Sequence, residues 1–118
     1  MRRLLVALAL AASPAAAEDW DTADKILGVT AATLVITDWG QTRYIAKHPE
    51  LYREKNILLG EHPSVRKVDV YFSGLLIGGY LLADWLPSSE RKTFLSIVSI
   101  IWFKATRDNK QLGVKVEF

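Results

Sequence analysis

The stretch VDVYFSGLLIGGYLLADWL, residues 68–86, decides the fold class because it is long and almost entirely apolar. A helix needs about 20 mainly apolar residues to cross the hydrocarbon core of a bilayer. This stretch meets that length, and its charged residues, Asp69 and Asp84, lie near its two ends. It therefore predicts a transmembrane helix.

Two other apolar segments flank this stretch. The first covers residues 26–46 and contains Asp38. The other, residues 93–103, is short, and it spans a bilayer only if Lys104 and Arg107 extend their side chains to the headgroups. The three segments together predict an all-α, three-helix transmembrane bundle. Two spans with a surface helix, or a soluble helical protein, are the alternatives.

The first 17 residues have the pattern of a secretory signal peptide. Arg2 and Arg3 precede a short apolar run, and Ala15 and Ala17 form the small-x-small site that signal peptidase reads. We expect cleavage after Ala17, which leaves residues 18–118 as a single helical membrane domain. An uncleaved N-terminal helix is the alternative.

The charge of the chain changes once this segment is set aside. The whole chain has 15 Lys and Arg against 13 Asp and Glu. Because the first 17 residues hold two basic residues and no acidic one, residues 18–118 carry 13 of each. A neutral balance argues against nucleic acid as a partner, and the absence of Cys excludes disulfides and thiolate metal sites.

The charges are distributed unevenly along the sequence. Acidic residues precede the first apolar segment, whereas basic residues are concentrated between residues 43 and 67 and after residue 103. Cytoplasmic loops of membrane proteins carry excess Lys and Arg. The pattern predicts a bacterial inner-membrane protein with its mature N-terminus outside and its C-terminus in the cytoplasm. In this topology all four tryptophans fall near a membrane surface: Trp20, Trp39, Trp85 and Trp102.

Boundary residues predict the connections between the helices. Pro49 suits the first turn of a helix and Gly60 suits its end, so we expect a short amphipathic helix over residues 49–59 on the membrane surface. The tail over residues 111–118 alternates apolar and polar residues, as a strand does; a flexible tail is the alternative. The expected N-caps of the three helices are Asp21 or Thr22, Ser64, and Ser88 or Ser89.

Polar residues within the apolar segments form one candidate site. Their spacing places Asp38, Gln41 and Thr42 on one helical face, and three further residues fall at a similar depth. Ionisable residues at membrane depth tend to face protein or water. The set is interpreted either as a structural hydrogen-bond and ion-pair cluster joining three helices or as a polar site near the inner surface. Its members are Asp38, Gln41, Thr42, Asp69, Lys104 and Arg107.

Small residues one helical turn apart form a second candidate feature. Gly74 and Gly78 are such a pair on the second apolar segment, and Gly28 and Ala32 are another on the first. These pairs allow close approach of helix backbones. The sequence leaves open whether they serve self-association or packing within one chain. It also suggests that the second segment lies at the centre of the bundle.

The connection between the first two apolar segments contains a motif, and a second motif precedes it. The connection contains Glu54-x-Asn56-x-x-Leu-Gly-x-x-Pro-Ser, and Asp38-Trp-Gly-Gln41-Thr42 lies before it in the first apolar segment. This combination resembles a pattern, D-W-x-Q-T then E-x-N-x-x-L-G-x-x-P-S, of uncharacterised small polytopic membrane proteins of bacteria and their phages. The resemblance covers about residues 38–72 and implies a helical membrane protein without a settled activity.

No catalytic, cofactor or metal site is expected. His48 and His62 lack the spacing of a zinc motif, and the sequence contains no Gly-rich phosphate loop. We expect a protein without enzymatic activity that acts through helix association in the lipid bilayer, with a second copy or another membrane protein. Its role is that of an accessory subunit or of a membrane-remodelling protein, with holin-like lysis as a specific form. The alternative is a small channel or carrier that uses the carboxylates Asp38 and Asp69.

Overall fold

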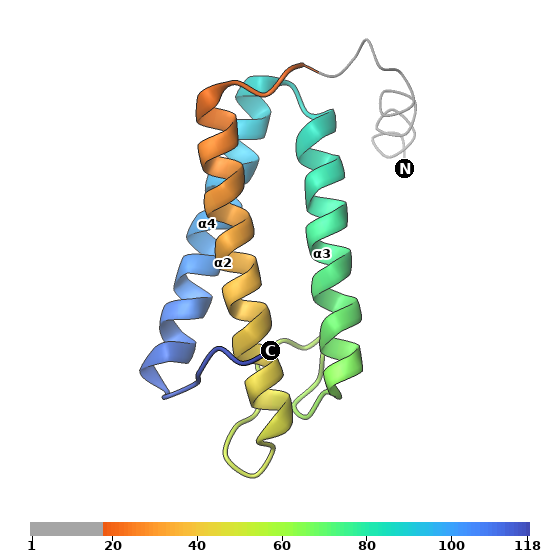
Figure 1. The fold of residues 1–118 in the computed structure, drawn as a ribbon, viewed down its shortest axis with the longest axis vertical. Coiled ribbons are helices and arrows are strands. Elements are labelled where there is room, and N and C mark those ends of the chain that lie inside the picture. The colour runs from red at the N-terminus through yellow and green to blue at the C-terminus, as the bar shows by residue number, and fades with distance from the viewer. Residues whose placement is uncertain (1–17) are drawn as a thin grey trace.

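The computed structural model describes residues 18–118, and in this range three helices run down, up and down in the view of Figure 1. Helix α2 covers Thr22–Lys47, α3 covers Val65–Trp85, and α4 covers Ser88–Gln111. No strand occurs in this part of the chain. The all-helical prediction is therefore confirmed, with one helix on each apolar segment. The predicted signal peptide, residues 1–17, lies outside the described residues.

Helix α2 is the centre of the bundle. It packs against both other helices, whereas α3 and α4 make few direct contacts with each other. The prediction that the glycine-containing second segment is central is therefore wrong. Apolar side chains of all three helices form the core: Val35 of α2 packs with Val68 and Phe72 of α3 at one end, and Ala31, Ala83 and Leu95 pack together towards the other.

Two of the three predicted helix starts are confirmed. The Asp21 side chain accepts a hydrogen bond from the Asp24 N–H, and the Asp24 side chain accepts one from the Asp21 N–H, which completes a capping box. Ser64 caps α3 through the N–H of Lys67. The predicted Ser cap of α4 is wrong, because Ser88 is the first helical residue and its hydroxyl donates to Asp24 instead.

The predicted surface helix over residues 49–59 does not form. This connection consists of turns and irregular backbone. The carboxylate of Glu54 accepts from the N–H groups of Lys55 and Asn56, and the Asn56 side chain accepts from the N–H of Leu58. Such local side-chain bonds occupy the donors that a helix would use, so they compete with helix formation.

The tail after α4 lies across α2 without regular structure. The N–H of Glu117 donates to the carbonyl oxygen of Gly40 at 3.1 Å, and Lys47 contacts the Glu117 carboxylate. The alternating pattern of the tail finds no neighbouring strand in the described part of the chain, so the strand that the pattern suggests is not formed.

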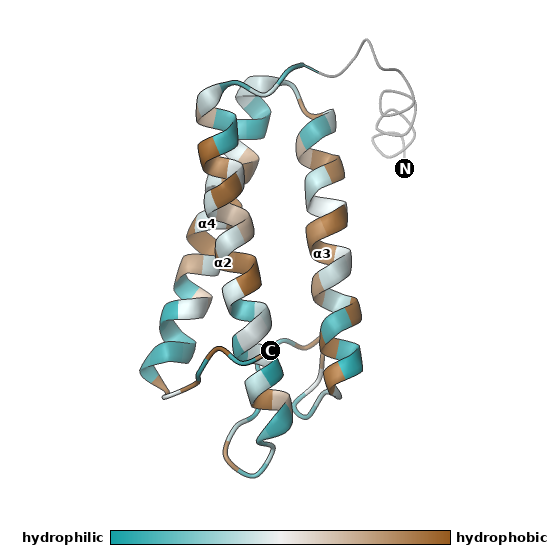
Figure 2. Cartoon of the chain, viewed as in Figure 1, coloured by the Kyte–Doolittle hydropathy of each residue, from teal (hydrophilic) through white to brown (hydrophobic). Residues whose placement is uncertain are grey.

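Apolar residues are concentrated around the middle of the bundle and hydrophilic residues towards its two ends, as Figure 2 shows. Large aliphatic side chains on all three helices face outward, among them Val29, Ile77 and Ile100. Within residues 18–118, no helix combines the length and the apolar character that a membrane crossing needs. The transmembrane character of the bundle therefore stays a prediction.

Candidate functional site

Arg91, in the first turn of α4, is completely buried at the end of the bundle where α2 begins. Its guanidinium binds the Asp24 carboxylate at 2.9 Å, and both side chains have an exposed fraction of 0%. The remaining N–H groups donate to main-chain oxygens that converge from the end of α3 and from the segment before α2. These acceptors are the carbonyl oxygens of Glu18, Asp19, Ala83, Asp84 and Leu86.

The Asp24 carboxylate accepts from three side chains in addition to the Asp21 N–H. Besides Arg91, the ammonium of Lys92 donates at 2.8 Å and the hydroxyl of Ser88 at 3.2 Å. Burial by itself would raise the pKa of Asp24, but the hydrogen bonds from Lys92, from the Asp21 N–H and from Arg91 outweigh it and hold this pKa well below its ordinary value. The carboxylate is therefore charged at neutral pH.

Trp20 covers this arrangement. Its ring centroid lies 4.8 Å from the Arg91 guanidinium carbon, which is a cation–π distance, and its indole N–H donates to Asp84 at 2.9 Å. We call this group the Arg91 cluster, defined as Trp20, Asp24, Asp84, Ser88, Arg91 and Lys92. It fastens both ends of the α3–α4 turn to the start of α2.

The sequence analysis missed the Arg91 cluster. A signal was present, because Asp24 lies just before the first apolar segment and Arg91 lies just before the third. In an up-down-up bundle these two positions meet at the same end, so opposite charges at matching depth would have predicted a pair.

At the other end, the predicted site divides into separate groups. Asp38, Gln41 and Thr42 do come together on one face of α2. Their partners on α4 are Asn109, which donates to Asp38 at 3.1 Å and to the Gln41 side-chain oxygen at 3.0 Å, and the carbonyl oxygen of Thr106, which accepts from Gln41 at 3.0 Å. This Asp38 group therefore joins α2 to α4 through neutral donors.

The remaining three predicted residues lie elsewhere. Asp69 of α3 is bound by the Arg43 guanidinium and by the indole N–H of Trp39 at 2.8 Å, so it joins α3 to α2. Lys104 and Arg107 are exposed and face Asp108 on their own helix. The structure thus does not assemble the six residues into one cluster, and Arg43 and Asn109 take the positions expected for Lys104 and Arg107.

The predicted packing glycines differ in their surroundings. A Cβ atom on Gly28 would lie 2.8 Å from the Trp20 ring, so this glycine serves packing within the chain. A Cβ on Gly74 or Gly78 would meet no atom within 4 Å. Both glycines and Ala32 line an open apolar groove of about 620 Å³ between the helices, which we call the glycine groove.

No group of three or more metal-ligating side chains occurs in residues 18–118. His48 stacks on Tyr44 at 4.1 Å between ring centroids, and its ring nitrogen bonds the Tyr44 carbonyl oxygen. It therefore belongs to the end of α2 rather than to a site with His62.

No protein-family model, no curated protein and no solved structure matches this chain. The resemblance carried by residues 38–72 thus stays a prediction, and function is argued from the geometry.

Proposed function

We propose that this chain is a small integral membrane protein that acts through association of its helices, as an accessory or membrane-remodelling protein without enzymatic activity. The observation that carries the proposal is an apolar outer face around the middle of the bundle, combined with a charged pair buried at one end. Its largest fully buried side chain is Arg91 and its partner Asp24 is also fully buried, whereas the outer face of the middle of the bundle carries large aliphatic residues. Lipid is the surrounding that suits such a surface.

The two ends of the bundle support the same proposal. The indole of Trp20 lies at the end where α2 begins, and that of Trp39 bonds Asp69 towards the other end, as expected for aromatic residues at two membrane interfaces. Ten of the 13 Lys and Arg residues after residue 17 belong to the end that holds the 48–64 connection and the tail. The positive-inside rule places that end in the cytoplasm.

The glycine groove supports action through association. Gly74 and Gly78 expose backbone to open space, so they do not serve close packing between the helices of one chain. A helix of a second copy fits this groove, because small residues let two backbones approach in a medium where burial of apolar surface adds little. A holin-like lysis protein is the specific form of this function that we favour.

Membrane integration and topology are tested together. The full chain should stay in the membrane pellet after alkaline carbonate extraction. A reporter that is active only in the cytoplasm should be active when fused after Phe118 and also when inserted near residue 55. Release by carbonate would overturn the proposed membrane integration, and a reporter that is inactive when inserted near residue 55 would overturn the proposed topology.

A small channel or carrier is the second candidate. It is favoured by Asp38, whose described hydrogen bonds come from the neutral side chains of Thr42 and Asn109 and from no cation. Asp38→Asn keeps the shape of this group, so it should leave membrane abundance unchanged. Loss of an ion flux in vesicles with unchanged abundance would favour the channel, and an unchanged flux would exclude a role for Asp38.

A further inference from the structure

A rigid turn stands out within the connection between α2 and α3. The N–H groups of Leu59 and Gly60 both donate to the carbonyl oxygen of Asn56, at 3.1 and 3.0 Å. The Asn56 side chain closes the turn by accepting from the N–H of Leu58 at 2.9 Å. Gly60 has φ of 82°, in the left-handed region that favours glycine. These hydrogen bonds and the conformation of Gly60 therefore define the backbone of residues 56–60.

This turn is fastened to the bundle on two sides. The Asn56 amide donates to the hydroxyl of Tyr71 at 2.8 Å. Leu59 has an exposed fraction of 3% and packs in the core with Val35, Val68 and Phe72. Tyr71 lies six residues into α3, or about 9 Å along its axis at 1.5 Å per residue. The turn thus lies against the flank of the bundle rather than beyond its end.

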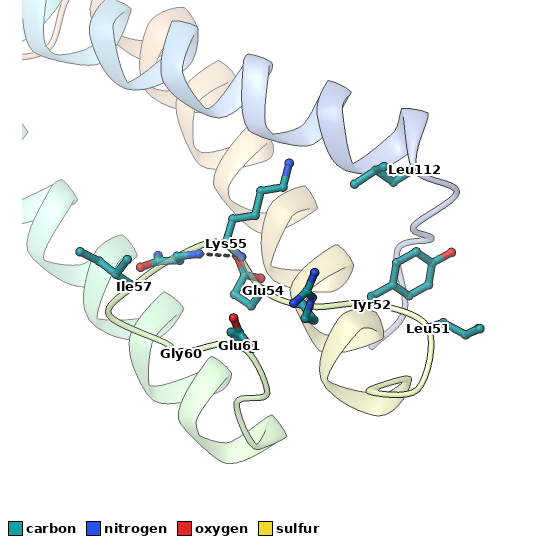
Figure 3. A pocket seen from close by; sticks show the side chains of 10 residues that line it. Leu51, Tyr52, Glu54, Lys55, Ile57, Gly60, Glu61 and Leu112 are labelled. Atoms are coloured by element: carbon teal, nitrogen blue, oxygen red, sulfur yellow. Dashed lines mark hydrogen bonds between the residues drawn. The ribbon is translucent and has the colours of Figure 1, made fainter.

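The two residues between these fastenings point outward. Ile57 is 93% exposed and Leu58 is 70% exposed. Figure 3 shows Ile57 at one end of the pocket of this connection, far from Leu51 and Tyr52 at the other. Two adjacent aliphatic side chains held in solvent contribute little to folding, and an external apolar partner would bury them.

Basic residues without an ion-pair partner precede and follow the turn in the sequence. Lys55 directly precedes it, and Arg66 and Lys67 lie in the first turn of α3; Arg53 completes the group. All four side chains are exposed, and none forms an ion pair with another residue of 18–118. By contrast, Arg43 and Lys47 of α2 and Arg91 and Lys92 of α4 are all paired.

We propose that the turn over residues 56–60 is a lipid-insertion element, with Ile57 and Leu58 entering the acyl region of the cytoplasmic leaflet while the four free cations bind anionic phospholipid headgroups. An apolar pair with adjacent basic residues is what an anionic interface binds. This inference rests on the proposed membrane function and adds the lipid class and the residues that bind it.

The absence of Cys from the natural sequence allows a direct test. The full-length Ile57→Cys variant, labelled with an environment-sensitive fluorophore, is reconstituted into vesicles of zwitterionic lipid alone or with added anionic phosphatidylglycerol. We expect blue-shifted emission and quenching by lipid-attached quenchers in the anionic vesicles. The matched control is Glu61→Cys, an exposed site four residues further along the same connection, which should show neither.

The headgroup contribution is tested by removing charge. Arg66→Gln combined with Lys67→Gln should shift the label towards water, by about fivefold in the inserted-to-free ratio for each cation removed. Equal quenching in zwitterionic and anionic vesicles would overturn the anionic preference. An unshifted label in protein that resists carbonate extraction would overturn the insertion alone and leave the proposed function standing. Extraction by carbonate would overturn both.

Discussion

At the scale of single residues, Arg91 is the largest fully buried side chain in residues 18–118. Six acceptors surround its guanidinium, five of them main-chain oxygens and one the Asp24 carboxylate. An arginine suits this position because its planar fork presents five N–H donors in fixed directions. Such a buried group matters for stability mainly because its removal leaves the buried charge and carbonyl oxygens around it without partners.

Replacement of Arg91 should therefore be severe. In Arg91→Met, the buried carbonyl oxygens lose their donors and Asp24 keeps only Lys92 as a cation. We expect the melting temperature in detergent, followed by circular dichroism, to fall by about 10 °C or more. Arg91→Lys should be intermediate, because an ammonium cannot reach all six acceptors. Lys104→Met, on the exposed face of the same helix, is the control and should melt like the parent chain; equal melting of all four proteins would contradict the role of Arg91.

Asp24 gives the protein a defined response to acid. Its pKa is held below that of an unfolded aspartate, so as pH falls the unfolded chain binds the proton first. The stabilisation is complete above the ordinary aspartate pKa of about 3.9 and is lost progressively as pH falls below it. The free energy of unfolding, measured by denaturant titration between pH 7 and pH 3, should decrease mainly below pH about 4. In Asp24→Asn this decrease should be smaller, and an unchanged pH profile would argue against the pair.

At the scale of elements, the segments that failed to match their predicted structure are the short ones. The 48–64 connection has helical periodicity, but its Glu54 and Asn56 side chains take the local N–H groups. The tail has a strand pattern, but it lies on a helix. In both segments a few specific contacts, and not the intrinsic pattern, decide the conformation.

The packing of the C-terminal tail against α2 depends on Gly40. A Cβ atom at this position would collide with the Val116 side chain and would lie 2.8 Å from the Phe118 ring. Gly40→Leu should release residues 114–118 from α2 while the three helices stay formed. Limited proteolysis should then remove the tail faster, with unchanged helical content by circular dichroism. Gly79→Leu, where a Cβ meets no atom within 4 Å, is the matched control; equal cleavage rates in both variants would show that the tail does not rest on Gly40.

At the scale of the whole molecule, the open side of the bundle is the feature that bears on function. Helices α3 and α4 make few contacts, and the glycine groove lies between the three helices. A self-contained bundle would fill this space with larger side chains, because protein interiors are close-packed. The groove is therefore the surface on which association should depend.

Gly74→Leu combined with Gly78→Leu tests that dependence. The new side chains have room within one chain, so the bundle should fold, but they would keep a second helix away. We expect cross-linked dimers and larger species to disappear in membranes, and toxicity on overexpression to fall with them. Single Gly→Ala changes should be milder, because alanine still allows close approach. Oligomers that persist in the folded double variant would remove the main support for a holin-like function.

The sequence by itself determined the features that depend on neighbours along the chain. Three helices formed on the three apolar segments, and Asp21 and Ser64 capped two of them, because helix formation and capping use hydrogen bonds within about four residues. The grouping of Asp38, Gln41 and Thr42 was also predictable, since the helical period alone places them on one face.

Only the tertiary structure decided which distant residues meet. Arg91 pairs with Asp24 across 67 positions, and Asn109 rather than Lys104 reaches Asp38. These pairings depend on the rotation and depth of each helix, which α2 sets by packing against both neighbours. The same packing leaves Gly74 and Gly78 facing open space and brings Leu59 into the core while Ile57 stays outside. These contacts cannot be predicted from the spacing of residues in the sequence, because they depend on how side chains of separate helices pack together.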